Sequence, residues 1–137
     1  AHFDSVTQLP NRTHFRREAG RILDDLPPDA LAGLFFIDLD KFKAVNDTLG
    51  HAQGDQLLIK VADRLRALAA PGGSAFARAP LIGRLAGDEF TMFVTGLQSR
   101  DEAERVGDAL LDALSEPYEL LGRNVEVGAS IGVALLP

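Results

Sequence analysis

The chain contains no cysteine among its 137 residues. This absence excludes disulfides, thiolate nucleophiles and cysteine-ligated zinc sites, and it favours a reducing compartment. Any chemistry must therefore come from oxygen and nitrogen groups.

Long apolar runs and a surplus of positive charge are also missing. No apolar stretch approaches the roughly 18 residues that a membrane-spanning helix needs, and the opening AHFDSVTQ lacks the basic and then apolar pattern of a signal peptide. The net charge of -6 argues against binding to a nucleic-acid backbone, which requires a basic face. We therefore expect a cytoplasmic segment that contacts neither nucleic acid nor membrane directly, within a parent protein that can still be membrane-anchored. A nucleotide accompanied by a metal ion stays open, because the metal brings its own positive charge.

With 46% hydrophobic residues, the chain is long enough for one compact domain and too short for two, so residues 1–137 are expected to form a single domain. Apolar residues at helical spacing predict three amphipathic helices, which follow Asn11, Gly54 and Ser99. Asn11 and Ser99 fit N-caps, and Ser99 forms a capping-box pattern with Glu102.

Short apolar stretches between these helices predict the strands. Residues 33–40 form a buried strand whose far end turns acidic, and residues 80–85 and 89–97 form a hairpin. Residues 124–137 form a further strand, broken by glycines that indicate a bulge or a close backbone approach. The order helix, strand, helix, hairpin, helix, strand predicts an α+β fold, in which helices flank a central, mostly antiparallel sheet related to the ferredoxin-like plan.

The first strand ends in a pair of acids. Asp38 and Asp40 lie on the same face of this strand, about 6.6 Å apart at roughly 3.3 Å per residue. Two carboxylates at a strand end are costly without a cation or hydrogen-bond donors. Considered alone, Asp40 also fits a cap of the following turn, KFKAVND, and Asp38 also fits a solvated acid.

A second pair of acids, Asp88 and Glu89, follows a tight turn. Alone, this pair fits the polar tip of a hairpin. If the hairpin lies beside the first strand, Asp88 and Asp38 converge, and with an adjacent backbone carbonyl they make an oxygen-ligand site suited to Mg²⁺ or Mn²⁺. Such an ion usually also holds substrate phosphates, which Lys43 and the N–H groups of residues 41–43 could receive. A solvated basic edge is the alternative for Lys43.

Asn46 and Asp55 form a third polar cluster. Asp55 directly precedes an amphipathic helix and fits an N-cap, and Asn46 equally fits a turn. The two side chains also match a guanine edge, because a carboxylate accepts from the ring N–H and the amino group while an amide complements the remaining positions. No partner is evident for His51, which we interpret as a turn histidine.

Four stretches match one family in the right order. They are DSVTQLPNRTHF, FFIDLDKFKAVND, GHAQGDQLL and RLAGDEF, followed by ASIGVA, and they run from Phe3 to Ala134. The chain thereby resembles the GGDEF domain, the diguanylate cyclase fold of bacterial cyclic di-GMP signalling. The combination is specific, whereas GDEF alone is a weak signal.

The resemblance implies roles for the acids. Asp38 and Asp88 correspond to the metal-binding carboxylates, with the Leu39 carbonyl as the backbone ligand. Glu89 corresponds to the second acid of the signature, near the metal and the reacting hydroxyl, so that Asp88 and Glu89 are the implied catalytic residues.

It also implies how substrate is held. Asn46 and Asp55 resemble the guanine readers, and Lys43 with the Phe42 backbone resembles the phosphate contacts. Gly87, in the signature turn, belongs with the implied substrate-binding residues.

Family members join two GTP molecules into cyclic di-GMP with loss of two pyrophosphates, using Mg²⁺ or Mn²⁺. Each domain holds one GTP, so the resemblance implies a homodimer that brings two sites face to face. It also implies a linked sensor domain, a linked phosphodiesterase (EAL) domain, or both. The alternative function is a GTP-binding regulatory module without cyclase activity.

The chain departs from the family pattern at three places. Ala86 replaces the first Gly of the signature, but a type II turn needs positive φ only at its second central residue, Gly87, so the fold is expected to tolerate it. ARAP at residues 77–80 replaces the Arg-x-x-Asp product-inhibition site, and we expect no such site here. Family members continue past the position of Pro137 with a further helix and strand that bear phosphate-binding Lys and Arg residues. We expect this chain to lack them and to be a piece of a larger multidomain signalling protein.

Overall fold

The computed structural model describes residues 2–70, 76 and 78–136. Within these residues the elements follow in the order α1 (Arg12–Asp25), β1 (Leu31–Leu39), α2 (Phe42–Leu49), α3 (His51–Ala69), β2 (Leu81–Ala86), β3 (Glu89–Leu97), α4 (Arg100–Ser115), β4 (Tyr118–Leu120), β5 (Arg123–Val125) and β6 (Ala129–Leu136). The predicted α+β class is confirmed.

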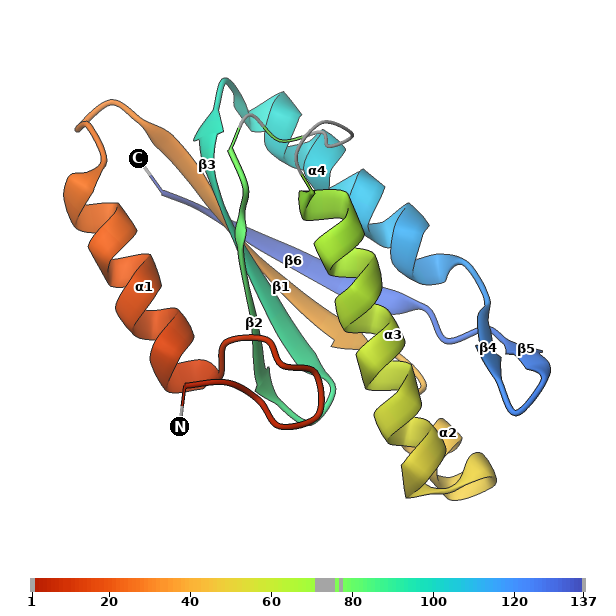
Figure 1. Cartoon of the computed structure of the whole chain (residues 1–137). Coiled ribbons are helices and arrows are strands. Elements are labelled where there is room, and N and C mark those ends of the chain that lie inside the picture. Colours follow the sequence, from red (N-terminus) through yellow and green to blue (C-terminus); the bar gives the residue numbers. More distant parts are fainter. Residues whose placement is uncertain (1, 71–75, 77, 137) are drawn as a thin grey trace.

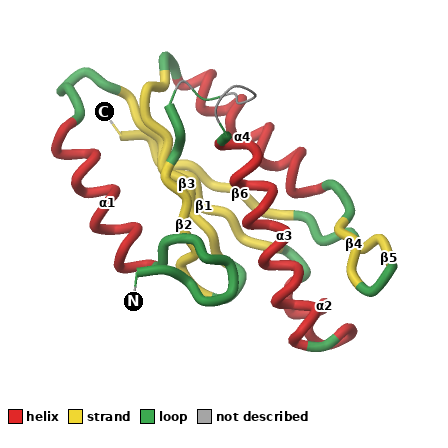
Figure 2. The backbone as a smooth tube through the Cα atoms, in the orientation of Figure 1, coloured by secondary structure: helices red, strands yellow, loops and turns green. Residues whose placement is uncertain are grey.

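The strands β2-β3-β1-β6 form one sheet in this order, and every neighbouring pair in it is antiparallel. The strands β4 and β5 pair separately as a short hairpin. Helix α1 lies on one face of the sheet, whereas α3 and α4 lie on the other (Figure 1). Figure 2 shows α2 at the N-terminal end of α3, in the part of the molecule that also carries the β4–β5 hairpin.

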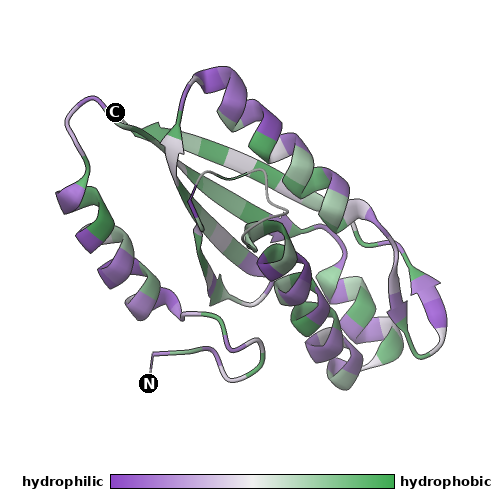
Figure 3. Ribbon diagram, turned by 45° about the horizontal axis from the view of Figure 1, so that its top comes forward, coloured by the Kyte–Doolittle hydropathy of each residue, from purple (hydrophilic) through white to green (hydrophobic). Residues whose placement is uncertain are grey.

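The alternation of side chains along β1 divides the core into two layers. Phe35 and Ile37 belong to one cluster with buried residues of α3 and α4. On the opposite face, Ala32 packs with Phe93 of β3 and Phe15 of α1. In Figure 3 apolar colour covers much of the strands, whereas the helices carry both apolar and hydrophilic residues, as expected for amphipathic helices packed on a sheet.

The face of the sheet that α1 covers is open at one end. Leu34 packs beside the α1 cluster, whereas Phe36, two residues further along the same face, is 46% exposed. The end of β1 beyond Phe36 is therefore accessible to solvent.

Several local predictions are confirmed. Asn11 accepts a hydrogen bond from the backbone N–H of His14 at 3.0 Å, and Ser99 accepts one from that of Glu102 at 3.1 Å, so both act as N-caps. The first strand and the hairpin appear as β1 and as β2 with β3, and their ends differ from the predicted bounds by at most two residues.

The sequence predicts one helix after Gly54, whereas the chain forms two helices, of which α3 already begins at His51. Gly50 alone joins them, with a φ of 95° that glycine adopts readily. The interpretation of His51 as a turn residue was therefore wrong, and the alternatives of a turn for Asn46 and an N-cap for Asp55 do not hold. The chain changes direction within one residue, which leaves both flanking segments free to be helical.

The β4–β5 hairpin was not predicted, because strands of three residues are too short to show alternation.

Much of the predicted loop APGGSAFARAP lies outside the described residues, as do Ala77 and Pro137. The expected absence of a product-inhibition site at residues 77–80 therefore stays a prediction. Among the described residues, no helix combines the length and the apolar character needed to cross a membrane.

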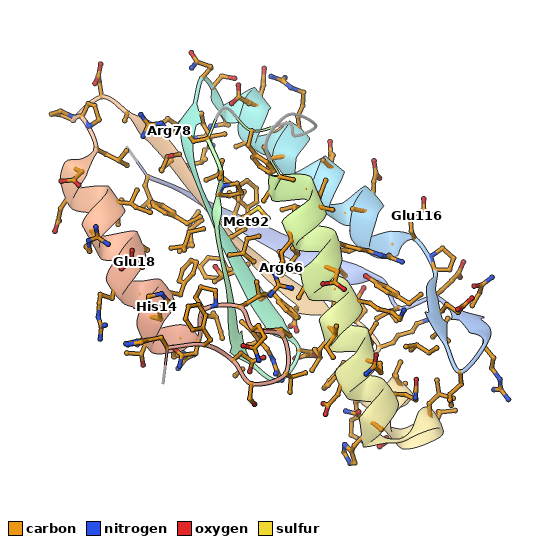
Figure 4. All side chains as sticks on the ribbon, in the orientation of Figure 1. His14, Glu18, Arg66, Arg78, Met92 and Glu116 are labelled. Atoms are coloured by element: carbon orange, nitrogen blue, oxygen red, sulfur yellow. The ribbon has the colours of Figure 1, made fainter. Side chains whose placement is uncertain are left out.

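The N-terminal loop, residues 2–11, is tied to both β2 and α3. The backbone N–H of Arg84 in β2 donates to the carbonyl oxygen of Pro10 at 3.0 Å. Arg66, labelled in Figure 4, reaches from α3 and donates to the carbonyl oxygen of Thr7. The loop is thus held by two elements that are distant from it in the sequence.

Asp4 anchors this loop through its carboxylate. It accepts hydrogen bonds from the N–H and the hydroxyl of Thr7, both at 2.8 Å, and pairs with Nη1 of Arg84 at 3.0 and 3.1 Å. The Arg84 and Asp4 side chains are only 14% and 19% exposed. Burial raises the pKa of Asp4, but the hydrogen bonds from Thr7 and Arg84 and the charge of Arg84 outweigh it, so the pKa lies below its usual value.

Gly83 of β2 marks a close approach between the sheet and α1. A Cβ atom there would lie 2.7 Å from Cδ2 of Phe15. We expect Gly83→Ala to lower the free energy of unfolding by about 1–3 kcal/mol, because the ring must move within a packed layer. The matched control is Gly20→Ala on α1, where a Cβ atom meets nothing within 4 Å and the change should be neutral or stabilising. Urea denaturation measures both, and equal effects of the two substitutions would contradict this packing argument.

The lowered pKa of Asp4 predicts a dependence of stability on pH. Because the folded-state pKa lies below the unfolded value of about 3.9, the contribution of Asp4 is complete above pH 4 and is lost as the pH falls through the folded-state pKa. We expect Asp4→Asn to lower the free energy of unfolding by about 1–3 kcal/mol at pH 7 and by progressively less toward pH 3. Denaturation at a series of pH values, with the exposed Asp112→Asn as control, tests this. A deficit that does not change with pH would contradict it.

Candidate functional site

Three polar side chains form a row across the open end of the sheet. The register places Asp38 of β1 opposite Glu89 of β3 on one side and opposite Ser130 of β6 on the other. Asp38 and Asp40 are exposed on either side of the buried Leu39, as the predicted alternation requires. The acids of the first strand therefore project away from the α3 and α4 core.

The signature turn joins this row at the end of β1. The backbone N–H of Leu39 donates to the carbonyl oxygen of Asp88 at 3.2 Å, which fixes the turn against the strand. Gly87 has a φ of 47°, whereas Ala86 is not among the residues with positive φ, so the expectation that the turn tolerates alanine is confirmed. Nε of Arg84 donates to the carbonyl oxygen of Gly87 at 3.0 Å and closes the turn from within.

The predicted convergence of Asp38 and Asp88 appears in the electrostatics. Although Asp38 is exposed, its pKa is raised, first by partial loss of hydration at this crowded end of the sheet and then by the negative charges of Asp88, Glu89 and Asp40. The ionised form of Asp38 is therefore less favourable here than in water. A cation placed among these carboxylates would relieve that cost.

A hollow of about 340 Å³ opens beside the acids on the same face. Its walls combine carboxylates with apolar side chains, and its lining consists of Phe36, Ile37, Asp38, Leu85, Glu89, Phe90, Ser130, Ile131 and Gly132. The acids thus border a concave surface rather than a flat one.

Asp40 does not cap a following turn. The segment after it is the helix α2, whose N-cap residue, Lys41, makes no side-chain capping bond. Asp40 instead accepts a hydrogen bond from the hydroxyl of Ser130 at 2.6 Å, and its N–H donates to the carbonyl oxygen of Gly128 at 3.2 Å. It therefore ties the end of β1 to β6.

The donor set fits Mg²⁺ or Mn²⁺ through two carboxylates rather than three. Within the described part of the chain, no group of three or more His, Cys, Asp or Glu side chains is arranged to hold a metal ion. Mg²⁺, however, commonly takes only one or two protein carboxylates and completes its octahedron with water and substrate phosphates. Asp38 and Asp88, with the Leu39 carbonyl oxygen, are residues that could provide such a partial set.

Asn46 and Asp55 lie on two helices that meet at Gly50. A Cβ atom on Gly54 would lie 1.8 Å from Oδ1 of Asn46. The Asn46 amide therefore occupies space on α3 that is free only because residue 54 is glycine. Asp55 is the next residue along α3 and is exposed. The structure thus brings the two predicted guanine readers to one inter-helix junction.

Lys43 makes its ion pair within α2. Its Nζ contacts Oδ2 of Asp47 at 2.9 Å, and both side chains are largely exposed. Phe42 begins the helix and packs its side chain partly into the core. The structure therefore places Lys43 near Asn46, one turn away on α2, and not in an ion pair with the acids of β1.

Arg84, Gly54 and Ser130 belong to the site but were not predicted. Arg84 could have been suspected, because a charge inside the apolar strand PLIGRL needs a partner. Gly54 also gave a signal, since a glycine within a helix costs about 1 kcal/mol relative to alanine and usually has a packing reason. For Ser130 the only signal was its place in the matched stretch ASIGVA, which assigns it no role.

Comparisons with known proteins agree with this geometry. The family model described as "Diguanylate cyclase, GGDEF domain" matches residues 1–137. Diguanylate cyclase TpbB of Pseudomonas aeruginosa is 39% identical over 140 residues, which cover 100% of this chain and 30% of that protein. Cyclic di-GMP phosphodiesterase NbdA of the same organism is 39% identical over 139 residues, which cover 100% of this chain and 17% of that protein. The chain thus spans less than a third of the length of these relatives.

The solved structures lead to the same group. A structure of TpbB from Pseudomonas aeruginosa that comprises only the GGDEF domain has a TM-score of 0.87 at 37% identity, and the match covers 99% of this chain and 76% of that chain. The antiparallel sheet, the paired acids at its open end and the match along the whole sequence show that this chain belongs to the diguanylate cyclase GGDEF domain family.

Proposed function

We propose that this domain is a diguanylate cyclase, which condenses two GTP molecules into cyclic di-GMP and releases two pyrophosphates. The observation that carries the proposal is the position of the signature turn, which the bond from the Leu39 N–H to the Asp88 carbonyl oxygen holds at the end of β1 beside Asp38, in a chain of this family. Asn46 and Asp55 support it, because together they match the hydrogen-bonding edge of guanine.

Asp38, Asp88 and the carbonyl oxygen of Leu39 are the ligands that we assign to Mg²⁺ or Mn²⁺. The bound ion would lower the pKa of a ribose 3'-hydroxyl and neutralise charge on the departing pyrophosphate. To Glu89, which lies opposite Asp38 in the register, we assign the role of accepting the hydroxyl proton. The 3'-oxygen then bonds to the α-phosphorus of the other GTP, and the bond from that phosphorus to pyrophosphate breaks.

The substrate contacts come from α2 and α3. Asp55 accepts from the ring N–H and amino group of guanine, and the Asn46 amide binds the remaining polar positions. The first turn of α2 has no side-chain cap, so the N–H groups of Phe42 and Lys43 are assigned to phosphate oxygens. Gly87 leaves the signature turn without a side chain where the nucleotide passes.

A homodimer is part of this proposal. One domain holds one GTP, and each 3'-hydroxyl attacks the nucleotide of the other domain, so two copies must face each other across their sites. The acids lie at an exposed end of the sheet, which leaves them accessible to a second copy. The need for GTP favours a cytoplasmic position, and we propose a linked sensor or EAL domain that controls the encounter.

A GTP-binding regulatory module is the second candidate. It is favoured by Ala86 in the signature and by the similarity to NbdA, a relative described as a cyclic di-GMP phosphodiesterase. In this function the domain binds GTP without turnover and controls a linked phosphodiesterase.

Incubation with GTP and Mg²⁺, at concentrations that force two copies together, separates the candidates. Cyclic di-GMP and pyrophosphate in a ratio of one to two support the cyclase. GTP binding by calorimetry without product would support the regulatory module, and the absence of any GTP binding would defeat both.

Replacement of Asp88 tests the metal assignment. We expect Asp88→Ala to abolish metal-dependent GTP turnover and to change the free energy of unfolding by less than about 1 kcal/mol. The backbone bond from Leu39 to residue 88 stays, and the repulsion with Asp38 falls. Asp112→Ala, which removes an exposed acid from α4, is the control that should retain turnover. Loss of the folded state in the Asp88 variant would show that its role is structural.

Gly54→Ala tests the assignment of the guanine readers. The added methyl group takes the space of the Asn46 amide, so the side chain must rotate away. We expect GTP affinity to fall about tenfold or more, equivalent to the loss of at least one hydrogen bond to the base. The fold should be unaffected or slightly more stable, because alanine favours a helix over glycine by about 1 kcal/mol. Calorimetry with GTP, with the exposed Gln56→Ala as control, measures this, and an unchanged affinity would remove Asn46 from the site.

A further inference from the structure

The Arg84 guanidinium connects the N-terminal loop to the signature turn. Its Nη1 contacts both carboxylate oxygens of Asp4, while its Nε donates to the carbonyl oxygen of Gly87 at 3.0 Å. The side chain is 14% exposed, and its contacts with Asp4 are partly buried, whereas the bond to Gly87 lies at the surface. One planar group therefore holds a loop and a turn that are about 80 positions apart in the sequence.

The contact with Gly87 acts on the peptide that precedes Asp88. Arg84 holds this peptide on one side, and the N–H of Leu39 holds the carbonyl oxygen of Asp88 on the other. With the main chain fixed at both points, Asp88 is held beside the end of β1, close enough to Asp38 for its charge to act on that carboxylate. The position of this carboxylate therefore depends on an arginine that acts through the main chain of the turn at Gly87.

Asp4 sets the position of Arg84 in turn. Thr7 fixes the Asp4 carboxylate through two hydrogen bonds, so the carboxylate presents a defined pair of oxygens to the guanidinium. The fork geometry of arginine serves both partners at once, whereas the ammonium of lysine is a point charge on a flexible stem. A displacement of the N-terminal loop would thus reach Gly87 through a rigid group.

We propose that Arg84 is a positioning residue for Asp88, through which the N-terminal loop at Asp4 sets the geometry of the metal-binding carboxylates. This inference rests on the proposed cyclase function. In this proposal residues 2–11 transmit a regulatory signal to the site. A segment attached before them would change the rate of GTP turnover by displacing Asp4, and with it Arg84 and the signature turn.

Arg84→Lys is the decisive variant, because it retains the charge and removes the fork. Arg64→Lys is its matched control, since Arg64 also bridges distant segments, donating to the carbonyl oxygens of Ala113, Glu116 and Pro117, but lies on the far side of the core from the acids. The measurements are kcat and KM for GTP, the affinity for Mn²⁺ in the presence of GTP, and the melting temperature.

For Arg84→Lys we expect kcat to fall about 10- to 100-fold, because a displacement of reacting groups by about 1 Å can cost about 100-fold in rate. KM should change less than about threefold, because the guanine readers lie on α2 and α3. The Mn²⁺ affinity should fall, while the melting temperature should drop no more than in Arg64→Lys, which retains kcat. Asp4→Asn should lower kcat in the same direction, and the double variant should lose little beyond Arg84→Lys alone, since both residues act through one contact.

Three results would overturn the inference: an unchanged kcat in Arg84→Lys, an equal loss of kcat in Arg64→Lys, or additive losses in the double variant. Failure of the proposed function has a different signature. If the unsubstituted chain binds GTP with Mn²⁺ but makes no product, cyclase activity is excluded, and the Mn²⁺ affinities of the two lysine variants still decide the role of Arg84. If the unsubstituted chain binds no GTP with Mn²⁺, both proposals fail.

Discussion

The antiparallel pairing of β1 with β3 is the constraint on which the acid site depends. Because strand side chains alternate, the register that places Phe35 and Ile37 in the core also places Asp38 outside, opposite Glu89. A slip of one residue in this register would turn Asp38 into the core and would expose Phe35 and Ile37 to solvent. The large hydrophobic penalty for that slip is what holds the acids in place, so the packing of the core under α3 and α4 determines where the carboxylates lie.

Two aspartates illustrate opposite uses of charge in this fold. Asp4 has a lowered pKa, so its ionised form adds to stability above pH 4. Asp38 has a raised pKa, so its ionised form subtracts from stability once the pH exceeds its unfolded-state pKa. The first is surrounded by donors and the second by other acids. Crowding of like charge in one small region, at the expense of stability, is typical of functional sites, where substrate or metal provides the missing countercharge.

The parts of this structure that local hydrogen bonds or long periodic patterns define could be predicted from the sequence. The helices capped by Asn11 and Ser99 are examples, and so is the alternation that exposes Asp38. Helix α2 was missed because the chain turns from α2 into α3 at the single residue Gly50, and no loop-like stretch in the sequence separates the two helices. The pairing of Asp4 with Arg84 was missed for another reason: it joins residues 80 positions apart, and no local pattern marks such a contact. The strand pattern located the acids and the family resemblance assigned their roles, whereas the contacts of Arg84 with Asp4 and with the signature turn are visible only in the structure.

The junction at Gly50 has a consequence for nucleotide choice. Asn46 and Asp55 stand on separate helices, and a single residue with a φ of 95° sets the angle between those helices. If these two residues read a base, the distance between them depends on how the two helices pack in the core, α2 through Val45 and α3 through Leu57. The choice of nucleotide base would then depend on the angle between α2 and α3. Substitutions in the core beneath either helix could change that angle, and with it the base preference, without any change to Asn46 or Asp55.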